Sequence, residues 1–159
     1  AAIAQPARTP AGARKLCSDY PWACRATETG TAKKASILSL AISVNRQVNR
    51  NIRQRSDRAQ YGVGEKWVLP IDAGDCEDLA LLKMRKLIDR GVAPANLRLA
   101  QVMKRNVPSH VVLLVRTGGS EEYILVSLAW RVTPRGTSEY IFLKQQSRSH
   151  PAQWETGRR

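Results

Sequence analysis

The sequence has few acidic residues, histidines and cysteines, and it contains no long apolar run. Its 159 residues include 13 Asp and Glu against 26 Lys and Arg, with two histidines and three cysteines. No apolar run approaches the ~20 residues that a membrane-spanning helix needs, so we expect no membrane span. No C2H2 spacing and no aromatic RNP-like strand is present, so nucleic acid is not the favoured partner. The length predicts one domain with its own core.

The net charge of +13 leaves two interpretations open. Basic residues are spread along the whole chain, which is typical of a strongly solvated surface. A denser cluster of arginines instead favours attraction to a polyanion, such as an anionic envelope polymer, an anionic lipid or nucleic acid. A helix-turn-helix protein has no simple signature, so nucleic acid stays a less favoured partner. The cluster comprises Arg46, Arg50, Arg53, Arg55 and Arg58.

Two of the three cysteines lie close together in the sequence. Cys17 and Cys24 flank Pro21, which bends the chain between them, and a local disulfide would close a small loop. Two free thiols or a metal pair are the alternatives, although the spacing does not fit a CxxC zinc site. A disulfide would indicate an oxidising compartment, so we expect a periplasmic or secreted protein whose signal peptide has been removed. Cys76 would then be the one free thiol.

The hydrophobic pattern predicts helices first and strands afterwards. A short helix or turn is expected over 13–25, an amphipathic helix over 35–52, a loop over 55–75 with Trp67 as an aromatic anchor, and a second helix over 76–90 that stops at Gly91. Strands are expected over 97–103, 110–116, 123–130 and 139–144, with a hairpin turn at 117–120.

This order predicts the α+β class, with N-terminal helices packed on an antiparallel sheet of about four or more strands. We expect a flexible lead-in over 1–12, one domain over 13–154, a tail over 155–159 and a monomer. The tail residue Trp154 is expected to pack back on the domain.

The segment from Gly74 to Asp78 carries the strongest sign of chemistry. With Asp75 as N-cap and Asp78 three residues into the helix, Cys76 falls in the first helical turn, where the helix dipole favours a thiolate. A small buried cysteine at a helix start is the simpler alternative. The acids on both sides oppose a thiolate unless an imidazolium or a cation offsets them. Helix capping alone explains these acids, but Asp75 and Glu77 are also candidate calcium ligands.

His110 is the one histidine inside the predicted folded region, because His150 lies in the polar tail. A histidine at a strand end is often a surface or core residue without a catalytic role. If Cys76 has a general base, His110 is the candidate for it.

These residues carry a family resemblance. The run Gly-Asp-Cys-Glu-Asp-Leu-Ala-Leu-Leu-Lys, followed by Leu-Ile-Asp-Arg-Gly-Val and His-Val-Val-Leu, resembles the bacterial transglutaminase-like cysteine proteinases. Asn45 to Trp67, with Asp57 and Tyr61-Gly62, and Tyr140 to Trp154 are similar as well. The resemblance implies a papain-like, transglutaminase-type core in which Cys76 is the nucleophile and His110 the base. It also implies calcium at Asp75 and Glu77, although the chemistry itself requires no cofactor.

The sequence departs from the family pattern at the third catalytic position. The family has an aspartate on the strand after the histidine strand, and the corresponding residues here are Val126 and Ser127. A two-residue turn would pair His110 with Ser127, whereas longer turns would slide the pairing to Leu128 or Ala129. None of these residues is acidic; the acids that could substitute are Glu121, Glu122 and Glu139.

We therefore expect a cysteine peptidase-like hydrolase of a protein or peptide substrate, with weak or lost activity because a triad aspartate orients the imidazole. The alternatives are a transglutaminase-type or deamidase-type acyl transferase, and a catalytically degenerate module that binds a peptide or an envelope polymer.

Overall fold

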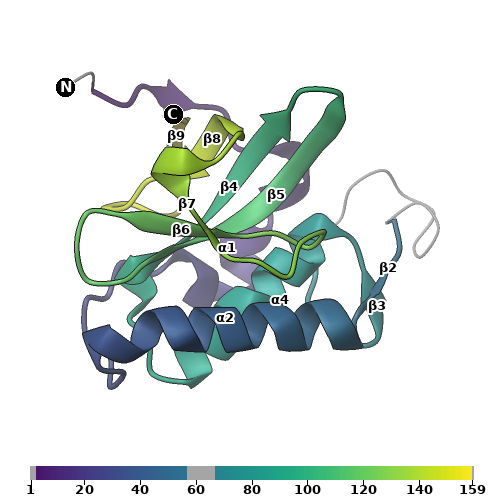
Figure 1. The fold of residues 1–159 in the computed structure, drawn as a ribbon. Coiled ribbons are helices and arrows are strands. Elements are labelled where there is room, and N and C mark those ends of the chain that lie inside the picture. The colour runs from purple at the N-terminus through teal and green to yellow at the C-terminus, as the bar shows by residue number, and fades with distance from the viewer. Residues whose placement is uncertain (1–2, 57–66, 159) are drawn as a thin grey trace.

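The structure of this chain is a computed structural model that describes residues 3–56 and 67–158 (Figure 1). The described residues form three α-helices: α1 (Leu16–Asp19), α2 (Lys34–Asn51) and α4 (Cys76–Asp89). The longer strands are β4 (Leu97–Lys104), β5 (Val107–Arg116), β6 (Glu122–Leu125) and β8 (Ile141–Gln146). The short strands are β1 (Pro6–Ala7), β2 (Arg53–Gln54), β3 (Ala73–Gly74), β7 (Thr133–Pro134) and β9 (Trp154–Thr156).

Seven strands form one antiparallel sheet in the order β1-β9-β8-β4-β5-β6-β7. The long β4–β5 hairpin lies at its centre, and β2 and β3 form a separate parallel pair. Four short 3-10 turns complete the described elements: Ala11–Ala13, Pro21–Cys24, Pro94–Asn96 and Arg135–Thr137. The predicted α+β class with an antiparallel sheet is confirmed.

The two faces of the sheet bury different side chains, because successive strand residues point to opposite sides. Val111, Leu113 and Val115 of β5 belong to the main core, together with the buried faces of α2 and α4. Val112 and Leu114 belong to a second, smaller cluster on the opposite face. Figure 1 shows α2 and α4 on the same side of the central hairpin. The helix that carries Cys76 therefore packs directly against the strand that carries His110.

The start of α4 has the capping arrangement that the sequence predicts. Asp75 and Asp78 form a reciprocal capping box, in which the Asp75 N–H donates to the Asp78 Oδ2 at 3.4 Å. Gly74 must be a glycine here, because a Cβ on it would approach the Asp78 Cβ to 2.8 Å. The helix stops before Gly91, as predicted, and the φ of +90° at Gly91 suits a residue without a Cβ. These local features fix the position of Cys76.

The third predicted strand is shorter than expected, and the prediction over 126–130 is wrong. β6 ends at Leu125, and the following backbone bonds to amide side chains of α2 instead of a neighbouring strand. The Asn49 Nδ2 donates to the carbonyls of Val126 and Ala129, both at 3.0 Å, and the Asn45 Nδ2 donates to the Ala129 carbonyl at 3.0 Å. The loop beside His110 is therefore held by the long helix.

The two ends of the chain pair with each other. β1 lies antiparallel to β9, so residues predicted as lead-in and tail form the edge of the sheet. The predicted Cys17–Cys24 disulfide is confirmed. Gln146 is fully buried; it donates to the carbonyls of Ala23 and Pro151 and accepts from the Leu99 N–H. The disulfide-bonded segment is thus anchored to β4 and to the C-terminal loop.

Trp67 and Trp154 pack edge to face, with ring centroids 5.9 Å apart. This agrees with the prediction that Trp67 anchors its loop and that Trp154 packs back on the domain. Part of the loop predicted over 55–75 lies outside the described residues, as do Asp57, Arg58, Tyr61 and Gly62. Within the described ranges, no helix is both long enough and apolar enough to cross a membrane.

Candidate functional site

The candidate nucleophile lies where α4 meets the edge of β5. The Cys76 thiol donates to the Glu77 Oε2 at 3.1 Å, and the Val111 N–H donates to the Cys76 Sγ at 3.4 Å. On β5, the pairing with β6 covers only Leu113 to Arg116. Val111 lies beyond this paired part, and its N–H donates to the Cys76 sulfur instead. The thiol is half-buried, and it contacts the backbone one residue after His110.

The surroundings of Cys76 favour the protonated thiol. Burial is the largest cause that raises the pKa of Cys76, and the charges of Glu77 and Asp75 raise it further, to about 12. The Val111 N–H acts in the opposite direction but does not compensate. Burial and the charge of Asp75 also raise the pKa of Glu77, to about 8. At neutral pH the thiol therefore keeps its proton in this conformation.

Asp75 and Glu77 supply the kind of ligand that a hard cation prefers. The Asp75 carboxyl group is close enough to raise the pKa of Glu77 through its charge and a hydrogen bond. A bound cation would offset this repulsion between the two carboxylates. Calcium takes six to eight oxygen ligands. Within the described part of the chain, no group of three or more His, Cys, Asp and Glu side chains is arranged to hold a metal. The pair therefore fits calcium in its chemistry and forms only part of a ligand shell.

A buried lysine lies on the same face of α4. Lys83 is two helical turns after Cys76 and is fully buried, and its Nζ has no hydrogen-bond partner among the described residues. Helical side chains lean toward the N-terminus, which directs the lysine stem toward Cys76. Burial lowers the pKa of Lys83 to about 7, and the charge of Cys76 opposes this shift. The sequence reasoning missed Lys83, although its seven-residue spacing from Cys76 was a visible signal.

The candidate base, His110, directly precedes Val111, whose N–H contacts the Cys76 sulfur, but the His110 side chain is not bonded to Cys76. His110 follows the alternation of β5 and lines a small pocket on the face opposite α4, together with Val112 and Tyr140. Its ring is edge to face with Tyr140, with centroids 6.3 Å apart. Burial lowers the pKa of His110. Among the described residues, no hydrogen bond or ion pair joins the His110 and Cys76 side chains. Tyr140 was not predicted here, because only the folded sheet brings it beside the histidine.

Val126 and Ser127, the residues at the third catalytic position, line the same small pocket as His110, together with Leu128. Continuing the β5–β6 register places Leu128 opposite His110, which matches the longer-turn alternative. No acidic residue of the described chain lines this pocket.

The three glutamates that could substitute are occupied or distant. Glu139 is an exposed residue that pairs with Lys104 at 2.7 Å. Glu122 pairs across the sheet with Arg116, six residues along β5 from His110, and Glu121 is exposed beside it.

The comparisons with known proteins agree with this architecture. The sequence model of the bacterial transglutaminase-like cysteine proteinases matches residues 3–158. None of the curated protein sequences matches this chain.

Among solved structures, calcium-bound LapG from Legionella pneumophila is 24% identical, with a TM-score of 0.60 over 70% of this chain. The chain spans 65% of the length of that LapG chain. LapG without a stated ligand and LapG treated with EGTA, from the same organism, are each 22% identical with a TM-score of 0.56. These two alignments cover 84% and 88% of this chain and 80% and 82% of theirs. The likeness to LapG is one of fold.

The family match covers nearly the whole chain, including α4, the sheet and the paired termini. The chain belongs to the bacterial transglutaminase-like cysteine proteinases.

Proposed function

We propose that this chain is a cysteine peptidase that cleaves a protein or peptide substrate, with Cys76 as nucleophile and His110 as general base. The observation that carries the proposal is the contact between the Cys76 Sγ and the Val111 N–H at 3.4 Å. It brings the first turn of α4 to the residue next to His110 in the chain.

In the proposed reaction, His110 takes the thiol proton and the sulfur attacks the carbonyl carbon of the scissile peptide bond. The bond to nitrogen breaks, the amine leaves with the proton from the imidazolium, and an acyl-enzyme remains. Water then gives a proton to His110 and attacks the acyl carbon, the carbon–sulfur bond breaks, and the sulfur takes the proton back from His110 as the acid product leaves. The Cys76 N–H, in the first turn of α4, is a donor for the oxyanion.

Calcium is a proposed cofactor held by Asp75 and Glu77. When bound, it would supply positive charge beside the sulfur and offset the two carboxylates that raise the pKa of Cys76. Calcium-bound LapG is consistent with this proposal. Calcium added to chelator-treated protein should raise the thermal midpoint; Glu77→Gln should remove this shift and Glu121→Gln should keep it. An equal shift in all three proteins would contradict the assignment.

The peptidase proposal is tested by incubating the protein with a peptide library and identifying new termini by mass spectrometry. We expect products that disappear in Cys76→Ala and His110→Ala and persist in His150→Ala, because His150 is exposed and bonds Ser149. Adding a primary amine separates the related alternative, since amide products would indicate an acyl transferase. Cleavage that persists in Cys76→Ala would contradict the proposal.

A second candidate function, a degenerate binding module, is favoured by the surroundings of His110. The pocket around the ring holds Val126, Ser127 and Leu128 where a triad needs an acid. The binding-module function is supported if the native chain shows no peptide turnover, Ser127→Asp shows turnover, and Ser120→Asp, at an exposed position, shows none. Turnover in the native chain contradicts it.

The disulfide favours an oxidising compartment, so we propose a periplasmic or secreted location. The net charge of +13 makes an anionic envelope polymer a further candidate partner.

A further inference from the structure

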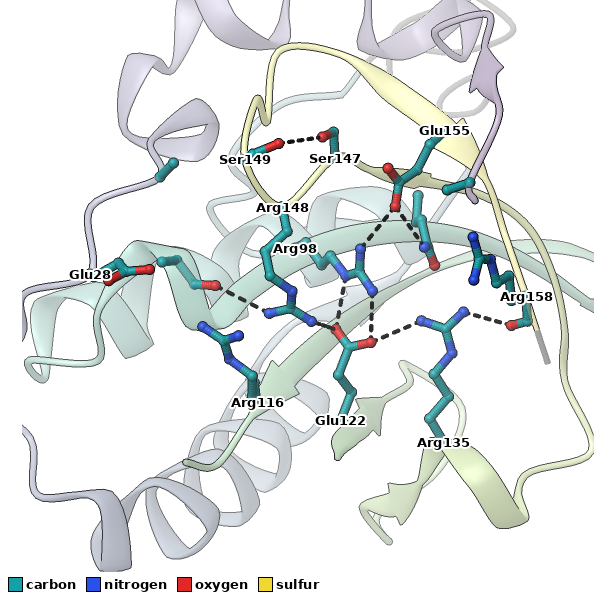
Figure 2. Close-up of a pocket in the computed structure, with 14 residues that line it drawn as sticks. Glu28, Arg98, Arg116, Glu122, Arg135, Ser147, Arg148, Ser149, Glu155 and Arg158 are labelled. Atoms are coloured by element: carbon teal, nitrogen blue, oxygen red, sulfur yellow. Dashed lines mark hydrogen bonds and ion pairs between the residues drawn. The ribbon is translucent and has the colours of Figure 1, made fainter. Parts of the chain in front are cut away.

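An arginine-rich pocket lies at the other end of β5 from His110. It has a volume of about 730 Å³, within the range of small-molecule sites. Figure 2 shows side chains from separate strands and loops converging on it. Arg116 is six residues from His110 along β5, which corresponds to roughly 20 Å of strand. The pocket is therefore separate from the proposed peptidase site.

The inner wall of the pocket is an ion-pair network centred on Glu122. The Arg98 guanidinium binds both Glu122 oxygens at 2.8 Å, and Arg135 and Arg148 each donate to this carboxylate at 2.9 Å. Glu155 adds a second carboxylate, 3.3 Å from Arg98. Burial raises the pKa of Glu122, but the three arginines lower it by more. The buried Glu122 carboxylate thus binds three guanidinium groups. Even with Glu155 counted, the network carries more positive than negative charge.

Two further arginines line the pocket outside this network. The Arg116 Nε donates to the Asn96 Oδ1 at 3.1 Å, which leaves the donors at the end of its guanidinium toward the pocket. Arg158 is exposed and extends beside the pocket in Figure 2. Burial is the largest cause that lowers the pKa of Arg148, and the like charges of Arg98 and Arg116 lower it further. Counting Glu28, the lining residues carry five positive and three negative charges.

We propose that this pocket binds a small organic dianion through a phosphoryl group. Arginine forks match the oxygens of a phosphoryl group, and a dianion would neutralise the surplus of two charges. The pocket is larger than phosphate alone requires, which leaves room for an organic body. The Ser147 and Ser149 hydroxyls, 3.4 Å apart, lie at the same pocket and offer neutral hydrogen bonds to that body.

The test is calorimetric titration of the full chain with inorganic phosphate, glucose 6-phosphate and citrate at constant ionic strength. We expect the native protein to bind glucose 6-phosphate with a dissociation constant below about 1 mM. Arg116→Gln and Arg158→Gln should each weaken binding by about tenfold, because each removes a charged hydrogen bond. Both substitutions leave the ion pairs of Glu122 in place. Arg105→Gln, at an exposed position in the β4–β5 turn, is the matched control and should bind as the native protein does.

Tighter binding of glucose 6-phosphate than of inorganic phosphate would support an organic phosphate, and equal binding would support the phosphoryl group as the whole determinant. Tighter binding of citrate than of either phosphate would overturn the proposal, because the site would then select carboxylates. The proposal is also overturned if no phosphate binds up to about 10 mM, or if Arg105→Gln weakens binding as much as Arg116→Gln.

Discussion

The Cys76 thiol is held as a hydrogen-bond donor rather than as a thiolate. It donates to Glu77 at 3.1 Å, and burial together with the carboxylates raises its pKa to about 12. The Val111 N–H acts in the opposite direction but does not compensate. The conformation described therefore holds the protonated thiol, which in the proposed mechanism would be a resting state. In the proposed mechanism, attack by Cys76 would require positive charge near the sulfur, from an imidazolium, from calcium or from Lys83.

The charges around Cys76 were predictable from the sequence, but its burial was not. The motif places Asp75, Cys76 and Glu77 in adjacent positions, so their repulsion follows from spacing alone. Burial does not follow from spacing, because it depends on β5 closing over the helix start. The burial of Lys83 was not predictable either, because in the sequence it resembles an ordinary surface lysine, although the core encloses it completely.

Replacing Lys83 by methionine should stabilise the protein at neutral pH. The pKa of Lys83 falls from 10.5 in the unfolded chain to about 7 in the folded one. Between these values the unfolded chain binds more protons, so this residue makes native stability rise with pH. Lys83→Met removes the buried amine and should gain about 2 kcal/mol near pH 7, with the gain shrinking toward pH 10. Urea unfolding at several pH values measures this difference.

Lys86→Met, a less buried lysine on the same helix, is the matched control and should change stability little. A loss of stability in Lys83→Met would show instead that the ammonium has a charged partner in the core.

At the scale of elements, the long segments were predictable and the short ones were not. The periodic apolar pattern located α2 and α4 to within about two residues. The strands β1, β7 and β9 contain two or three residues each, too few for a pattern to appear. The apolar run after Leu125 reads as strand, but Asn49 and Asn45 are placed by tertiary contact to take its hydrogen bonds.

Asn49→Ala should loosen the loop beside His110. The substitution removes the two hydrogen bonds from Asn49 to the Val126 and Ala129 carbonyls of the loop, so we expect a loss of about 2 kcal/mol. Hydrogen exchange should accelerate over 126–130 while β4 stays protected. Asn51→Ala, at the exposed end of α2, should leave both measurements unchanged. Unchanged exchange in Asn49→Ala would contradict this role.

At the scale of the molecule, Glu122 joins segments that are far apart in the sequence. Its arginine partners come from β4, from the turn after β7 and from the loop after β8. No local pattern predicts such a network, because its members are up to 50 residues apart in the sequence. By contrast the disulfide was predictable, since its two cysteines are seven residues apart.

Glu122→Gln should therefore destabilise the whole fold. The three arginines would lose this carboxylate, and within the described part of the chain only Arg98 would keep a second one, Glu155. Breaking a buried ion pair costs about 3–5 kcal/mol. The pKa of Glu122 is lowered in the folded state, so its contribution is present at neutral pH and is lost as acid protonates the carboxyl group. Denaturant unfolding at pH 7 and at low pH should show a difference that shrinks in acid. Glu121→Gln, the exposed neighbour, should behave as the native protein does.

The most direct test of the proposed Cys–His pair is the rate at which iodoacetamide alkylates Cys76 at pH 7 in the presence of calcium. With the disulfide intact, Cys76 is the free thiol, so intact mass reports its modification alone. We predict that the native protein and His150→Ala react at the same rate and that His110→Ala reacts at least about tenfold more slowly. Equal rates in the native protein and His110→Ala would contradict the account.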